Sequence, residues 1–83
     1  MLQEQVMYTL VEYSSSEILD VITFTDYKLA KASMAEKAYQ AIIKAQETDN
    51  FSFIDNDETT YKIFYKDGEW LQYKVIPNNL YGF

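Results

Sequence analysis

Residues 64–70 read FYKDGEW and join two segments in which apolar residues alternate with polar ones. Such alternation predicts strands, and a short Asp-Gly loop between two strands predicts a β-hairpin. The length of the loop matters, because a slip of one residue in the pairing moves every side chain to the opposite face. The pairing across this loop therefore decides how the sheet is built.

Two loop lengths are compatible with the hairpin. A two-residue turn made of the Asp-Gly pair mixes lysines with apolar residues on both faces. A three-residue loop from Lys66 to Gly68, with the glycine in the left-handed conformation, pairs Phe64 with Trp70. Only the longer loop separates the residue types cleanly, so we predict it. One face then holds Tyr61, Ile63, Tyr65, Leu71, Tyr73 and Val75, and the other holds Thr60, Lys62, Phe64, Trp70, Gln72 and Lys74.

One helix is predicted upstream of the hairpin, where apolar residues recur at helical spacing. Ser33 and Glu36 have the spacing of a capping box, which satisfies free amides at a helix start. This places the helix at residues 34–47. Extending it backward would put Lys31 among the apolar residues, so residues 27–31 are expected to be extended.

The other segments complete an α+β domain. Strands are predicted at residues 5–13, 18–25, 51–55, 59–65 and 70–76. Phe51 and Phe53 are expected to share a face. Pro77 is expected to end the last strand because it has no amide donor, leaving residues 77–83 as a C-terminal tail. We predict a single domain over residues 1–83: an antiparallel sheet of about five strands, in the order strand-strand-helix-strand-strand-strand, with the helix on one face.

Charge limits the choice of partner. The chain has seven lysines, no arginine, thirteen acidic residues and a net charge of −6. Proteins that bind nucleic acid need cations to replace the counterions of phosphates, so direct nucleic-acid binding is not expected. A protein with a basic surface is the more natural partner.

Composition also argues against catalysis. The chain has no histidine and no cysteine, which removes the usual general base, the best nucleophile and the usual zinc ligands. Two glycines are too few for a loop that cradles phosphate. We therefore predict no enzymatic activity and no cofactor. No apolar stretch approaches the ~20 residues needed to span a bilayer, and the amino terminus does not resemble a secretory signal, so a cytoplasmic protein is expected.

An aromatic surface is the first candidate site. A single helix covers only one face of a sheet, and the other face would display Trp70 and Phe64 among lysines. This surface could bind a partner protein, join copies of the chain, or stack on single-stranded nucleic acid. Alternatively, Leu80, Tyr81 and Phe83 of the tail could cover it. Its residues are Lys62, Phe64, Trp70, Gln72 and Lys74.

An acidic span is the second candidate site. Its two loops flank one short strand, so its charges could converge or lie at opposite ends of that strand. They could be solvated turns, or they could bind lysines and arginines of another protein in place of phosphates. A calcium loop is disfavoured, because the segment lacks the glycine and the distal glutamate of such loops. The residues are Glu47, Asp49, Asp55, Asp57 and Glu58.

These features predict a small, acidic, non-enzymatic module that binds another protein. Abundant Lys, Asn, Ile and Tyr with no arginine indicate an AT-rich gene, and this composition resembles that of small accessory proteins of phages and mobile elements in low-G+C bacteria. Together with the acidity, the small size and the missing catalytic groups, this resemblance leads to the prediction of a protein that modulates or inhibits a host protein that handles nucleic acid. The alternative is a homo-oligomeric assembly protein that uses the aromatic face.

Overall fold

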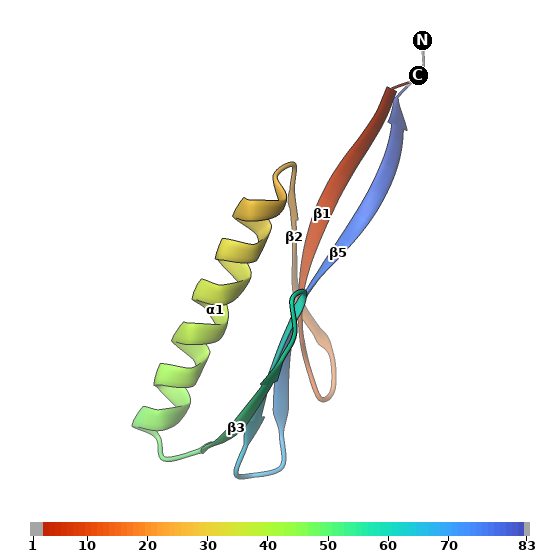
Figure 1. Ribbon diagram of the computed structural model, residues 1–83. Coiled ribbons are helices and arrows are strands. Elements are labelled where there is room, and N and C mark those ends of the chain that lie inside the picture. Colours follow the sequence, from red (N-terminus) through yellow and green to blue (C-terminus); the bar gives the residue numbers. More distant parts are fainter. Residues whose placement is uncertain (1–2, 83) are drawn as a thin grey trace.

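The computed structural model of the chain describes the backbone of residues 3–82 and the side chains of residues 7–77. The elements are β1 (Gln3–Ser14), β2 (Ile18–Phe24), α1 (Tyr27–Glu47), β3 (Phe51–Asn56), β4 (Thr60–Tyr65) and β5 (Trp70–Gly82). The five strands form one antiparallel sheet in the order β2-β1-β5-β4-β3 (Figure 1). The predicted α+β class, strand number and order of elements are confirmed.

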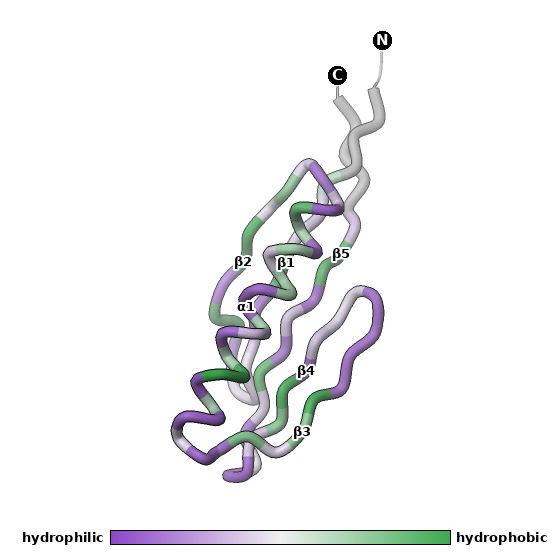
Figure 2. The backbone as a smooth tube through the Cα atoms, turned by 60° about the vertical axis from the view of Figure 1, so that its left-hand side comes forward, coloured by the Kyte–Doolittle hydropathy of each residue, from purple (hydrophilic) through white to green (hydrophobic). Residues whose placement is uncertain are grey.

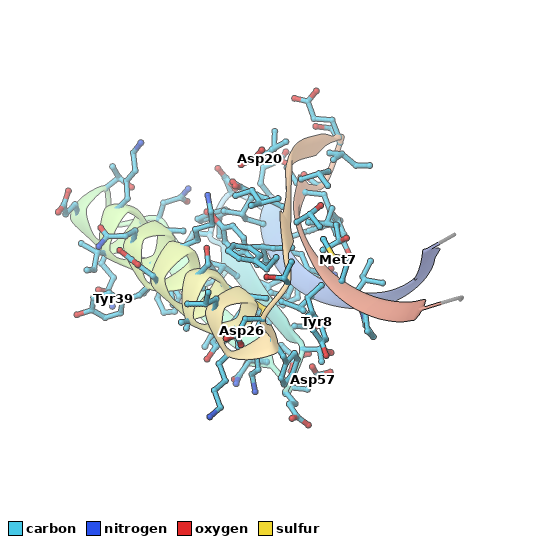
Figure 3. All side chains as sticks on the ribbon, turned by 90° about the horizontal axis from the view of Figure 1, so that it is seen from above. Met7, Tyr8, Asp20, Asp26, Tyr39 and Asp57 are labelled. Atoms are coloured by element: carbon cyan, nitrogen blue, oxygen red, sulfur yellow. The ribbon has the colours of Figure 1, made fainter. Side chains whose placement is uncertain are left out.

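The helix lies on one face of the sheet because of the strand order. It joins β2 and β3, which are the two edge strands. The helix, with a length of roughly 31 Å, therefore passes over the sheet from one edge to the other (Figure 2). We call the covered side the inner face and the uncovered side the outer face. Figure 3 shows Tyr39 on the side of α1 that points away from the sheet, and its side chain is 62% exposed.

The core fills the space between the inner face and α1. It is apolar throughout: the described residues include no buried polar or charged residue. The helix contributes mostly alanines, which let it approach the sheet closely, and one large side chain. The core cluster consists of Leu10, Ala30, Met34, Ala38, Ile63, Leu71, Tyr73 and Val75.

The hairpin between β4 and β5 has the predicted three-residue loop. The Tyr65 amide donates to the Glu69 carbonyl at 3.0 Å, and Phe64 pairs with Trp70. Gly68 has a φ of 93°, the left-handed conformation that the loop requires. The residues predicted to face the core do so: Ile63, Leu71, Tyr73 and Val75 are buried, and Tyr61 and Tyr65 pack against them.

The predicted helix start is wrong. Residues 27–31 are helical, and the N-cap is Asp26, whose carboxylate accepts a hydrogen bond from the Lys28 amide at 2.8 Å. The buried side of α1 continues backward from Met34 to Ala30, and both are 0% exposed. Lys31 stays partly in solvent with its ammonium 5.5 Å from the Tyr27 ring centre. A long lysine can lie along an apolar surface in this way, so it does not end a helix.

Replacing Asp26 tests this start. Asp26→Ala should destabilise the fold by about 1 kcal/mol, because it removes the acceptor for an amide that has no partner inside the helix. Ser33→Ala is the control: Ser33 lies inside α1, where alanine is the better helix former, so stability should stay the same or rise slightly. Urea unfolding followed by circular dichroism measures both. A larger loss for Ser33→Ala would restore the later start.

The prediction that Phe51 and Phe53 share a face is also wrong. The pairing of β3 with β4 shifts between them, so that Phe51 pairs with Tyr65 while Phe53 pairs with the adjacent Phe64. This irregularity places one extra residue in β3 and reverses the side on which the following side chains point. Phe51 packs against the core, and Phe53 is 55% exposed on the outer face.

The last strand does not end at Pro77. It continues to Gly82 and pairs with β1 up to Gln3, so residues 77–82 are strand rather than tail; Phe83 lies outside the described residues. The Val75 amide donates toward β4, to Thr59, and Pro77 has the same orientation two residues on. Its missing amide would therefore point past the end of β4, where no ladder bond is lost. Residues 3–7 of β1 pair only with β5, and together these segments form the two-stranded arm that projects from the sheet in Figure 1.

Candidate functional site

The structure brings the aromatic candidates together on the outer face. The pairs Phe64–Trp70, Lys62–Gln72 and Thr60–Lys74 follow one another along β4 and β5. The Lys62 ammonium lies over two rings, 4.3 Å from the Trp70 centre and 5.1 Å from the Phe64 centre. A cation in this position is attracted by the electron-rich faces of the rings and holds them in place.

Two further rings join this group, and neither was predicted. Phe53 stacks on Phe64, with centres 4.3 Å apart and an interplanar angle of 13°. Tyr13 meets Trp70 edge to face at 6.1 Å. Tyr13 could not be assigned to a face from the sequence, because β1 carries apolar residues on both sides. Phe53 was not predicted on this face because the sequence does not show the register shift in β3.

Aliphatic side chains extend this surface toward β2. Val11 pairs with Val21 on one side and with Lys74 on the other, so all three share the outer face. Among the exposed apolar residues of this face, Ile18 is 67% exposed, Val21 54% and Ile76 38%. Within the described residues nothing covers them. The β5 backbone carries residues 78–82 away from Trp70 along the arm, and Phe83 lies outside the described residues.

The acidic candidates do not form one patch, because they lie toward both ends of β3. At the end that meets α1, Asp49 pairs with Lys66 at 2.9 Å. At the other end, Glu58 lies 3.9 Å from Lys31 and accepts a hydrogen bond from Tyr27. Glu47 is exposed at the end of the helix. These three are therefore not positioned to act together.

Asp55 and Asp57 lie beside the aromatic group instead. They line a shallow depression of about 350 Å³ on the outer face, together with Lys62 and Gln72. Asp55 pairs directly with Lys62 across the strands, and Asp57 accepts from the Thr59 amide at 2.9 Å. The two candidate sites thus share one border, which the sequence did not reveal. No group of three or more metal-binding side chains occurs in the described part of the chain.

A second concave site lies on the opposite side of the sheet, between α1 and the inner face. Its volume is about 790 Å³, and it contains the Glu12 carboxylate and two tyrosines. Burial, the Glu12 charge and a hydrogen bond to Glu12 raise the pKa of Tyr73 above its ordinary value of 10.0. Burial, followed by the charges of Asp67 and Glu12, raises the pKa of Tyr65. Both phenols therefore stay protonated in the folded state at pH values where free tyrosine ionises.

These shifts predict a loss of stability in alkaline solution. The unfolded chain releases both phenolic protons from about pH 10 upward, while the folded chain keeps them. Unfolding then releases protons, so the stabilisation is complete below about pH 10 and declines as the pH rises through the raised pKa values. Urea unfolding at a series of alkaline pH values measures the slope. Tyr73→Phe removes one ionising group and should flatten it; an unchanged slope would contradict the assignment.

Comparisons with protein-family models, curated proteins and solved structures gave no significant match to this chain. Of the helices in the described residues, none has the length and apolar character needed to cross a bilayer.

Proposed function

We propose that this protein is a non-enzymatic module that binds a basic-surfaced partner protein through its outer face. The uncovered sheet face carries the proposal: aromatic and aliphatic side chains spread over all five strands, exposed on β2, β3 and β5 and partly exposed on β1 and β4. Contiguous apolar surface of this kind marks interaction sites in soluble proteins. The rings of Trp70, Phe64 and Tyr13 are residue types enriched in the centres of protein interfaces.

Charge selects the kind of partner. Asp55 and Asp57 border the aromatic group, and the net charge of −6 favours approach of a basic surface. Proteins that handle nucleic acid carry such surfaces, because they must replace phosphate counterions. Together with the composition, which resembles that of small phage and mobile-element accessory proteins, this leads us to propose a host nucleic-acid-handling protein as the partner, modulated or inhibited by occupation of its basic surface.

Affinity capture from host lysate with matched baits tests the proposal. Wild-type protein should retain a basic protein that a Trp70→Ala bait loses and a Tyr39→Ala bait keeps, because Tyr39 is equally aromatic but lies on the far side of α1. Retention by all three baits would place binding elsewhere, and capture of no basic protein would contradict the proposal.

The acidic residues should act mainly on the rate of association. Substituting Asp55→Asn and Asp57→Asn together keeps hydrogen-bond acceptors but removes two charges. Binding should weaken through the on-rate, and the melting temperature should change little, because exposed charges contribute little to stability. Added salt should weaken the wild type more than the variant. Stopped-flow association with the captured partner measures this; identical rates and salt dependence would assign these carboxylates to solvated turns.

A homo-oligomer is the second candidate, and the aliphatic part of the outer face favours it. Ile18, Val21 and Ile76 leave an apolar strip beside the rings, and two copies could cover it face to face. Light scattering after size-exclusion chromatography distinguishes the candidates. A stable dimer that Val21→Lys converts to a monomer supports self-association. A wild-type protein that is monomeric at all concentrations contradicts self-association and supports the partner-binding module.

A further inference from the structure

Two small helix residues, Ala41 and Ala45, line the cleft under α1, while Ile42 packs against the core. Met34 fills the space near the start of α1, but Ala41 and Ala45 replace it further along. The resulting volume of about 790 Å³ lies within the range of small-molecule sites. The floor is formed by β1, β4 and β5. Its charged and aromatic lining residues are Glu12, Glu36, Lys37, Lys44, Tyr65 and Tyr73.

Packing alone does not explain why a carboxylate, that of Glu12, lines this cleft. Glu12 lies on the inner face, in register with buried Tyr73, and its side chain is half-buried. Tyr73 hydrogen-bonds to the carboxylate, but the ion pairs of the described residues do not include Glu12. Withdrawing a carboxylate from water without a cation is costly, so the site favours a positive group beside Glu12.

The neighbouring strand increases this preference. Glu12 lies directly opposite Asp20 of β2, and like charges in such a pair destabilise a sheet. Lys37 offsets Asp20 from a distance of 3.9 Å, which leaves the Glu12 charge without a counterpart. Lys37 is thereby engaged, and Lys44 and Glu36, both exposed, line the cleft with opposite charges. These lysines would otherwise favour an anion in the cleft, and the overall charge of −6 opposes one.

The walls suit the rest of such a ligand. Leu71, Ala41 and Ala45 supply apolar contact, and the half-buried Tyr65 adds an aromatic ring to the lining. Aromatic rings attract organic cations through their electron-rich faces, and an apolar floor accepts a hydrocarbon body. We propose that the cleft between α1 and the inner face binds a small organic amine in its ammonium form, with Glu12 as the charge partner. The site is separate from the outer face and independent of the proposed function.

Three matched probes test the ligand class with the full chain. Phenethylammonium, neutral phenethyl alcohol and anionic phenylpropionate differ mainly in the charge of one group. In titrations followed by amide chemical shifts, the amine should bind about tenfold more tightly than the alcohol, because it forms a charge-assisted hydrogen bond. The shifts should cluster at Glu12, Tyr73 and residues 40–45. Equal or tighter binding of the alcohol or the acid would overturn the proposal, as would shifts confined to the outer face.

Variants then test the residue. Glu12→Gln keeps an acceptor for Tyr73 but removes the charge, so the preference for the amine over the alcohol should disappear. Glu47→Gln removes the same charge from the exposed end of α1 and should leave the preference intact. Ala41→Leu fills the cleft and should abolish binding of both the amine and the alcohol. Trp70→Ala, on the other face, should bind the amine as the wild type does. An unchanged preference in Glu12→Gln, or equal losses in Glu12→Gln and Glu47→Gln, would overturn the proposal.

Discussion

Ile63→Ala is expected to remove most of the stability of this protein. Ile63 is 0% exposed and lies on β4, in the core cluster that also contains Met34 of α1. Truncating a buried isoleucine costs about 3 kcal/mol, because apolar contacts are lost and a cavity remains. A domain of 83 residues has a total stability on the order of 5 kcal/mol. Equilibrium unfolding in urea should therefore show a midpoint far below that of the wild type.

The matched control is the same substitution at an exposed position. Ile18 is 67% exposed on β2, and Ile18→Ala should change the free energy of unfolding by less than about 0.5 kcal/mol. The difference between the two variants measures how strongly the inner face is buried. Similar losses at both positions would mean that the outer face is covered in solution, which would favour the homo-oligomer over the partner-binding module.

The hairpin was predictable because the glycine of its loop and the apolar pattern of its two strands both indicate the same loop length. Gly68 allows the left-handed conformation, and only the three-residue loop separates apolar from polar residues on β4 and β5. This local consistency determines the register, and the register determines which residues form the core. It also predicted the grouping of Lys62, Phe64 and Trp70, since a strand pair places its side chains without reference to the rest of the fold.

The errors share a physical cause, which is that tertiary context supplied what the local pattern lacked. Lys31 lies within the helix because the Tyr27 ring and Glu58 accommodate its ammonium group. Pro77 lies within a strand because its missing amide would point past the end of β4. Glu58 is distant from Lys31 in the sequence, and the surroundings of Pro77 depend on the strand order. No periodicity in the segment itself could have revealed them.

The border between the two candidate sites was hidden for a similar reason. The irregular pairing in β3 sends Phe53 to the outer face and keeps Asp55 beside Lys62. A regular strand starting from a buried Phe51 would have directed Phe53 and Asp55 toward the helix instead. A single extra residue therefore places an acidic side chain next to the aromatic group. Because of this arrangement, one contact surface could use both apolar burial and charge.

Trp70→Ala is expected to weaken binding of the partner roughly 30-fold, or about 2 kcal/mol, mainly through faster dissociation. Trp70 pairs with Phe64, contacts Tyr13 edge to face and lies beneath the Lys62 ammonium, so its removal loosens the centre of the outer face. The cost in stability should be smaller, about 1 kcal/mol, because a half-exposed cross-strand pair contributes little to folding. Dissociation rates by surface plasmon resonance and unfolding in urea separate the two effects.

Tyr39→Ala is the control, since this ring is 62% exposed on the opposite side of the molecule and has no part in the proposed interface. It should leave the dissociation rate unchanged. If Trp70→Ala lowers stability by several kcal/mol but a refolded sample binds normally, the aromatic group is a structural cluster and not an interface. If Tyr39→Ala weakens binding as much as Trp70→Ala, the partner contacts the helix side. In either case the outer face would lose its assigned role.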